Sequence, residues 1–448
     1  MLSTRGTRRH MGNRPMHDTA VSQRTPIVPL AGMMFLQFFL WGAWYVTLGP
    51  FMAAMKFSEG SIGNAYSVGP IAAIISPVFL GMIADRFFAS QRVLGIMHLL
   101  GGVALLAAPS VAAQSSGDAW PFVGLLLVHM LCYMPTLGLS NTVAFHHVKN
   151  QEKEFPLIRV LGTIGWIAAG FVVGYLMRQA AGANATEAQI AAQPVFFYAA
   201  GGCGIILGLF SFMLPHTPPP AAGRPFSLRD ALGLDAISML KSPSFAVFII
   251  CSFLICIPLA AYYSTAGRYV GATGFKDVAT TMTFGQMSEI FFMLVMPLCF
   301  ARLGVKWMLA VGMLAWVVRY GLFAAAWGGD GPGTHHVEWM VLGGIILHGI
   351  CYDFFFVTGQ IYVDKQAPKQ VRGQAQGFLV LVTQGVGMLI GAQVISRVVA
   401  ANTKLNDAGA EIGKNWQTIW LIPCIFAGAI LLIFLAAFRN GPKTTASN

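Results

Sequence analysis

Polar and ionisable side chains interrupt several long apolar stretches of this 448-residue chain, often at helical spacing. Arg159, Thr163 and Trp166 follow at i, i+4 and i+7, which places them on one face of a helix. A guanidinium, a hydroxyl and an indole on one face favour binding of a polar solute that carries a flat ring. The alternative is an arginine whose charged end reaches the edge of the apolar stretch.

A second pair, Gln286 and Glu289, shares a helix face at i, i+3. Glu289 lies deep in its apolar stretch, so it must either pair with a cation or stay neutral by holding a proton. A carboxyl group that changes its protonation is what proton coupling requires. A static ion pair is the alternative interpretation.

A third group contains His348, Tyr352 and Asp353. His348 and Tyr352 share a face at i, i+4, whereas Asp353 is turned by about 100° from Tyr352. We interpret Asp353 first as half of a structural ion pair with Arg319, and proton coupling is its alternative role. His348 can donate and accept hydrogen bonds, either to a bound solute or as a packing residue.

The first apolar stretch places Gln37, Trp41 and Trp44 on one face. We interpret the two tryptophans as packing or interfacial residues, while Gln37 either faces a cavity or bonds to a neighbouring helix. His98 and His129 are interpreted as packing residues.

Composition indicates the surroundings in which these groups lie. Apolar residues make up 56% of the chain and charged residues only 10%, whereas a soluble domain carries about 25% charged residues. This excludes a soluble globular or disordered protein and indicates an integral membrane protein in a lipid bilayer. The net charge of +11 does not indicate nucleic-acid binding, because no basic segment with interleaved aromatic residues occurs. The seven cysteines lie in apolar stretches without metal-binding or disulfide spacing, so we expect no metal site.

Twelve stretches are long and apolar enough to span a membrane as helices. Lysine and arginine are unequally shared between the two sets of connections, with 19 on the side of both termini and 7 on the other. This bias places both termini in the cytoplasm. The expected spans are 28–53, 62–84, 93–113, 120–145, 157–177, 193–214, 243–267, 279–301, 305–327, 340–363, 374–396 and 416–438.

The twelve spans fall into two sets of six. Prolines at 218–220 end the sixth span, and the segment 228–240 is expected to form an amphipathic helix on the inner membrane surface. His129 and Tyr133 in span four recur as His348 and Tyr352 in span ten, which indicates a duplicated unit. The predicted fold is therefore all-α, with two six-helix halves as in the major facilitator superfamily. The expected regions are a basic tail 1–27, a half 28–214, a central loop 215–242, a half 243–438 and a tail 439–448.

Seven segments in both halves resemble the nucleoside:proton symporter family of that superfamily, over about residues 28–438. The resemblance implies uptake of nucleosides with protons across the inner membrane, without a cofactor. The segments are FLQFFLWGAW (35–44), YMPTLGLSN (133–141), FPLIRVLGTIG (155–165), LGLDA (232–236), QMSE (286–289), YDFF (352–355) and WQTIW (416–420).

The resemblance also implies roles for single residues. Arg159 and Thr163 match the family's substrate ligands, Trp166 replaces a Phe, and Gln286, Glu289 and Asp353 match a Gln, a Glu and an Asp. Tyr352 stands where the permeases carry Phe. Three further positions depart from the family pattern: Ala260 and Tyr263 replace Gln and Asn, and His348 replaces Tyr.

The combined interpretation is a monomeric, proton-coupled nucleoside symporter that works by alternating access. We expect Arg159, Thr163, Gln286 and Glu289 to hold ribose hydroxyls or base edges, and Glu289 to carry the proton. The expected substrate-binding residues are Arg159, Thr163, Trp166, Tyr263, Gln286, Glu289, His348 and Tyr352, with the aromatic rings stacking on the base.

Two other functions fit the same residues. A symporter for another small polar metabolite, such as a sugar conjugate, would explain the changes at 260, 263 and 348. A membrane sensor that binds a solute without moving it is a third possibility. An enzyme is disfavoured, because the sequence contains neither a phosphate-binding loop nor a nucleophile–base motif.

Overall fold

The computed structural model describes residues 26–79, 85–115, 118–149, 151–219, 227–232, 234–329, 335–368, 371–408 and 411–439. Most of the two expected tails, and residues 220–226 of the central loop, lie outside these described residues.

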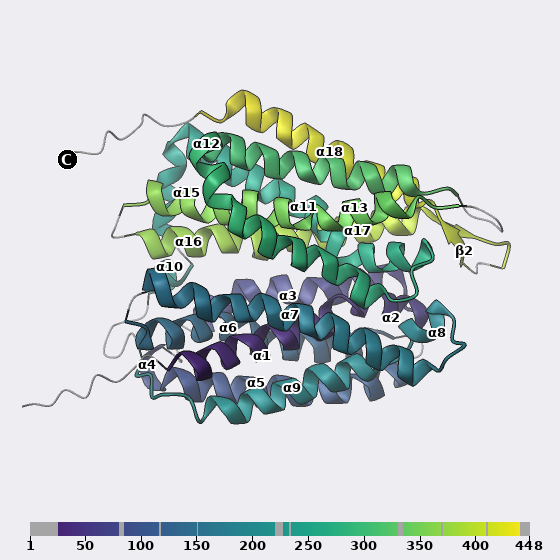
Figure 1. Cartoon of the computed structure of the whole chain (residues 1–448), viewed down its shortest axis with the longest axis horizontal. Coiled ribbons are helices and arrows are strands. Elements are labelled where there is room, and N and C mark those ends of the chain that lie inside the picture. Colours follow the sequence, from purple (N-terminus) through teal and green to yellow (C-terminus); the bar gives the residue numbers. More distant parts are fainter. Residues whose placement is uncertain are drawn as a thin grey trace, which may run out of the picture.

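The described chain forms two helical bundles that lie side by side (Figure 1). The first bundle, coloured purple to teal, contains α1 (Ile27–Tyr45), α2 (Leu48–Ala54), α3 (Glu59–Phe79), α4 (Asp85–Phe87), α5 (Ser90–Gln114), α6 (Trp120–His147), α7 (Gln151–Ala181), α8 (Glu187–Ala191) and α9 (Val195–Ser211). The second, coloured teal-green to yellow, contains α11 (Pro243–Ala272), α12 (Val278–Ala326), α13 (Glu338–Ile346), α14 (His348–Cys351), η3 (Tyr352–Val357), α15 (Thr358–Gln366), α16 (Arg372–Val380), η4 (Leu381–Gly387), α17 (Met388–Ala401) and α18 (Trp416–Ala437).

Among the described residues, eleven helical segments are long and apolar enough to span a membrane. One of them, α12, has 49 residues and bends at Gly304, whose φ of 68° and ψ of 177° are not helical. This conformation is essentially restricted to glycine, because a Cβ atom would clash with the backbone. The bend divides α12 into the two predicted spans 279–301 and 305–327, so the predicted all-α fold with twelve spans is confirmed.

Two spans of the second bundle are wider in their middle. Span ten contains the π-helical segment η3 between α14 and α15, and span eleven contains the π-helical segment η4 between α16 and α17. A π-helical turn accommodates an extra residue in a helix and is frequent at functional sites. The helical spacing used to predict which residues share a face is therefore changed in both spans.

The central connection differs from the single amphipathic helix expected over 228–240. The structure has a short helix α10 (Leu228–Ala231) and a 3₁₀ helix η2 (Leu234–Lys241) instead. Gly233 between them disfavours one continuous α-helix. Leu228 and Ile237 nevertheless expose apolar side chains.

The two ends of the paired bundles differ. At the end that we call the tail end, α1 begins and α18 finishes; at the opposite end, the hairpin end, strands β1 (Thr403–Leu405) and β2 (Glu411–Lys414) pair antiparallel (Figure 1). Near the hairpin end α3 packs on α17, and α7 packs on α12. A Cβ atom at Gly170 of α7 would overlap the Thr283 hydroxyl of α12, so glycine permits this close approach between the bundles.

Candidate functional site

A cavity lies between the two bundles, with walls from α1 and α7 on one side and from α11, α12, α14, η3, η4 and α17 on the other. Its volume of about 90 Å³ is enough to hold water molecules. The lining residues are Phe38, Trp41, Tyr45, Arg159, Thr163, Trp166, Tyr263, Gln286, Glu289, His348, Tyr352, Gln384 and Met388.

The structure brings all eight residues that we expected to bind substrate to the wall of this one cavity. Asp353 and Arg319 are fully buried and do not line it. Of the two span-seven positions that depart from the family pattern, Tyr263 lines the cavity, whereas Ala260 packs against α17, where Gly391 leaves space for it.

On the side of the first bundle, Arg159 is the charged group. Its guanidinium carbon lies 4.1 Å from the centre of the Phe38 ring. Among the residues that the structure describes, no carboxylate forms an ion pair with it. Its hydrogen-bond donors are therefore available to a molecule in the cavity, and Thr163 and Trp166 follow on the same helix face.

On the side of the second bundle, Glu289 faces His348. The distance between Glu289 Oε2 and His348 Nε2 is 4.0 Å, and the Glu289 side chain is 13% exposed. The two helices are held together at this point because the Ser288 hydroxyl accepts a 3.1 Å hydrogen bond from the Gly349 N–H. Glu289 is thus placed at the cavity by a tight crossing of α12 with α14.

The expected ion pair between Arg319 and Asp353 is not formed, and this prediction is wrong for the structure. The Arg319 guanidinium lies 3.3 Å from the centre of the Tyr262 ring, and its Nη1 is 3.3 Å from His348 Nδ1. Within the described part of the chain, neither carboxylate oxygen of Asp353 has a hydrogen-bond partner. The rings of Tyr262 and His348 stack with their centres 5.3 Å apart and their planes at 20° to each other. The guanidinium contacts these two rings rather than Asp353 in the π-helical segment.

Aromatic residues of α1 form a part of the cavity wall that the sequence interpretation missed. Trp41, interpreted above as a packing or interfacial residue, lies 5.4 Å from Trp166 and 5.8 Å from Tyr45, measured between ring centres. Its buried Nε1 has no hydrogen-bond partner. The signal was present in the sequence, because Phe38, Trp41 and Tyr45 follow at i, i+3 and i+7 and so share a face.

The adjoining face of α1, turned away from the cavity, holds the first bundle together. Gln37 is fully buried, donates a 2.7 Å hydrogen bond to Thr136 and pairs at 2.7 Å with His98 Nε2. His129 Nδ1 pairs with the Gly101 carbonyl at 2.9 Å. Gln37, His98 and His129 are therefore packing residues joined by hydrogen bonds, and the alternative that Gln37 faces the cavity does not hold in this structure.

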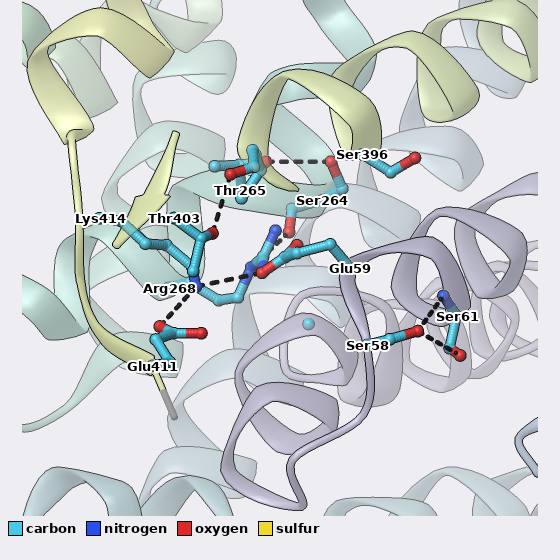
Figure 2. A network of polar contacts seen from close by, with 12 residues as sticks. Ser58, Glu59, Ser61, Ser264, Thr265, Arg268, Ser396, Thr403, Glu411 and Lys414 are labelled. Carbon is cyan, nitrogen blue, oxygen red and sulfur yellow. Dashed lines mark hydrogen bonds and ion pairs between the residues drawn. The ribbon is translucent and has the colours of Figure 1, made fainter. Parts of the chain in front are cut away.

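A second group of charges joins the bundles at the hairpin end (Figure 2). Arg268 Nη1 of α11 donates to both carboxylate oxygens of Glu59 of α3, at 2.8 and 2.7 Å. Lys414 of β2 lies 3.2 Å from Glu59 and also pairs with Glu411. The side chains of Arg268 and Lys414 are only 5% and 6% exposed. We call Glu59, Arg268, Lys414 and Glu411 the hairpin-end network.

Metal binding has no support in the described part of the chain, where no group of three or more His, Cys, Asp or Glu side chains could hold an ion. The residues that line the cavity make it a polar chamber with aromatic walls, with one arginine and one carboxyl group on opposite sides.

Comparison with known proteins gives matches over nearly the whole chain. Residues 27–443 match the family model described as nucleoside H⁺ symporter. The putative nucleoside transporter YegT of Escherichia coli K12 is 39% identical over 412 residues, which cover 92% of this chain and 93% of that protein. The nucleoside permease NupG of the same organism is 32% identical over 422 residues, 91% of this chain and 94% of NupG.

Solved structures agree with these matches. A crystal structure of nucleoside transporter NupG has a TM-score of 0.77 and 30% identity, and the match covers 93% of this chain and 99% of that one. A D-xylose-proton symporter has a TM-score of 0.68 at 13% identity, over 94% of this chain and 99% of the other, which shows likeness in fold alone.

Proposed function

Because the chain belongs to the nucleoside H⁺ symporter family, it is a proton-coupled nucleoside transporter with the major facilitator fold, and we propose that the central cavity is where it binds its substrate. The observation that carries this proposal is the convergence of Arg159 from the first bundle and Glu289 from the second on one chamber. A solute held between groups on both bundles can link their relative movement to its own passage, as alternating access requires.

The chemistry of the two walls fits a nucleoside. Arg159, Thr163 and Gln286 offer donors and acceptors for ribose hydroxyls and base edges. The rings of Trp166, Tyr263 and Tyr352 provide flat apolar surface for the base, and the newly found Trp41 and Tyr45 extend it.

Glu289 is our first candidate for the proton carrier. Its carboxyl group lies on the cavity wall, 13% exposed, and the basic side chain within 4.0 Å of it is a histidine rather than an arginine or a lysine. A carboxyl group without a fixed cation can gain and lose a proton as the cavity changes access. Asp353 is the second candidate, since both of its carboxylate oxygens lack a hydrogen-bond partner among the residues that the structure describes.

The orientation follows from the lysine and arginine bias. We propose that the protein lies as a monomer in the bacterial inner membrane with both termini in the cytoplasm, so that the tail end faces inward. The hairpin end then faces outward, and the hairpin-end network with the α7–α12 contact closes it. With this orientation, we propose that the structure represents the state closed to the outside.

Alternating access also requires parts of the protein that move relative to each other. We propose that residues 28–214 and 243–438 move as two halves, linked by the central loop 215–242, with terminal tails at 1–27 and 439–448. Leu228 and Ile237 in the linker expose apolar side chains that suit the inner membrane surface.

Substrate-dependent proton uptake by vesicles containing the purified protein tests this function. A pH-sensitive dye inside the vesicles should report inward proton movement when uridine or adenosine is added outside, and labelled nucleoside should accumulate with it. Protein-free vesicles are the control. Nucleoside transport without proton movement would contradict proton coupling at this cavity, and competition by sugar conjugates but not by nucleosides would favour the alternative substrate.

A further inference from the structure

His348 is held by neighbours on three sides, and their chemistry determines where its proton lies. Its ring stacks on Tyr262 at 5.3 Å and 20°. Its Nδ1 lies 3.3 Å from Nη1 of Arg319, and its Nε2 lies 4.0 Å from Oε2 of Glu289. The side chain is 3% exposed, so water contributes little to its hydrogen bonding.

Arg319 fixes the tautomer of this histidine. A guanidinium has five N–H donors and no acceptor, so the contact with Nδ1 requires Nδ1 to accept. A histidine whose Nδ1 accepts is neutral and carries its hydrogen on Nε2. The Nε2–H donor is therefore directed to the side of the ring where Glu289 and the cavity lie.

The space between His348 and Glu289 suits one shared oxygen atom. A separation of 4.0 Å is too long for a direct hydrogen bond. A single oxygen can nevertheless lie at about 2.8 Å from both atoms, the usual hydrogen-bond length. While Glu289 is ionised, before it takes up its proton, that oxygen must accept from the histidine and donate to the carboxylate. A hydroxyl group does both, as does a water molecule that the substrate would displace; a carbonyl oxygen cannot donate, and an ammonium group cannot accept.

We propose that His348 and Glu289 together bind one hydroxyl group of the substrate, and that Arg319 is the positioning residue that keeps the donor on His348 Nε2. This inference rests on the proposed function and deepens it, because it names the substrate group that meets the candidate proton carrier. A solute without a hydroxyl at this position leaves a buried donor and a carboxylate without their partner, which lowers transport.

The first test measures kcat/KM of uptake into vesicles for uridine and for its 2′-deoxy, 3′-deoxy and 5′-deoxy analogues. Hydrogen bonds to a charged group contribute about 1.5–3 kcal/mol, so removal of the bound hydroxyl should lower kcat/KM by about 10- to 150-fold. We expect one of the three analogues to show this loss. Equal transport of uridine and all three analogues would overturn the inference.

Three substitutions of His348 then locate the hydroxyl. His348→Gln places an amide near Nε2 and should keep the discrimination between uridine and the weak analogue. His348→Asn reaches only the position of Nδ1, and His348→Phe keeps the flat ring without a donor, so both should bring the ratio of the two kcat/KM values to within about threefold of one. A purely structural role would lower both values together and leave the ratio unchanged, which would contradict the proposal.

The positioning role of Arg319 is tested by measuring which ring nitrogen of His348 carries the hydrogen. In protein labelled with ¹⁵N-histidine, the His348 signals, identified by their loss in His348→Asn, should show hydrogen on Nε2, and Arg319→Met should convert part of the population to the Nδ1–H form. Hydrogen on Nδ1 in the unsubstituted protein would overturn the assignment. Failure to take up uridine at all would instead contradict the proposed function, so the two failures are distinguishable.

Discussion

Charged side chains meet at the bundle interface in two regions, and the two regions treat charge in opposite ways. In the hairpin-end network two cations and two carboxylates are matched, and Glu59 lies within 3.2 Å of both cations. Around the central cavity the four charged groups Arg159, Glu289, Arg319 and Asp353 form no ion pair with one another.

This difference distinguishes charged groups that hold the two bundles together from charged groups that can bind a solute or a proton. Charges that neutralise each other need no further partner, and a buried ion pair is costly to break because the remaining partner is left unpaired. Charges that lack counter-ions inside the protein are available to a solute or a proton, and the cavity can hold water around those on its wall. We therefore assign the hairpin end to conformational control and the cavity to recognition.

The largest expected effect breaks the matched region. Glu59→Gln leaves the 5% exposed Arg268 without a carboxylate, and loss of one partner from a buried pair costs about 3–5 kcal/mol. We expect the equilibrium to shift by about a hundredfold or more toward a state open at the hairpin end. Distances between spin labels at Met55 and Ile412, in a background without the native cysteines, should lengthen. An unchanged distance distribution would show that the network does not close this end.

The next largest effect is expected at the central cavity, whose charged groups form no ion pair with one another. Glu289→Gln should reduce concentrative uptake to equilibration, while exchange of labelled for unlabelled nucleoside persists. One proton moving down about 100 mV provides roughly 2.3 kcal/mol, which supports about fiftyfold accumulation, so the expected loss is of that size. Uptake against a gradient in vesicles measures it.

Two amide substitutions complete that experiment. Glu338→Gln changes an exposed carboxylate at the start of α13 and should leave accumulation at the unsubstituted level. Asp353→Asn tests the second candidate carrier. Normal accumulation by Glu289→Gln together with its loss in Asp353→Asn would transfer the proton-carrying role to Asp353.

A smaller effect is expected where a single cation is exchanged for another. Arg159→Lys retains the charge and removes the planar pair of donors, so the KM for uptake should rise by about tenfold, equivalent to about 1.4 kcal/mol. Arg178→Lys is the matched control, because Arg178 already pairs with Asp277 at 3.2 Å near the hairpin end. Equal KM values for the two variants would mean that the cavity arginine does not contact substrate.

The smallest effect lies inside the hairpin-end network. Glu411 pairs with Lys414 but is 52% exposed, and exposed ion pairs contribute about 0–1 kcal/mol. Glu411→Gln should therefore change the spin-label distances and the Tm only slightly. A response as large as that of Glu59→Gln would show that burial does not determine which member of the network matters.

Much of the fold and of the cavity wall could be predicted because helical spacing is a local property. Arg159, Thr163 and Trp166 share a face whatever lies opposite them, and the structure places that face on the cavity. Apolar length alone located the spans, including the two that the structure joins through Gly304.

What could not be predicted depends on distances between helices. The contact of Arg319 with Tyr262 and His348 needs the relative heights of three helices, and the π-helical segment at Asp353 changes the spacing from which its partner was inferred. Arg268 and Lys414 fall in predicted connections, after span 243–267 and before span 416–438, and the structure buries both against Glu59 of the other bundle. Sequence spacing carries no information on such long-range matches.

The glycine bend in α12 has a mechanical consequence. Gly304 joins the helical segment that carries Glu289 to the one that carries Arg319 without an intervening loop. Both segments approach His348, with Arg319 at its Nδ1 and Glu289 at its Nε2. We therefore expect Glu289, His348 and Arg319 to move together when the two halves move, while the distance from Glu289 to Arg159 on the other bundle changes. A substrate that contacts both Glu289 and Arg159 would therefore be bound differently when the protein is open to one side of the bilayer or to the other, because the distance between these two groups differs.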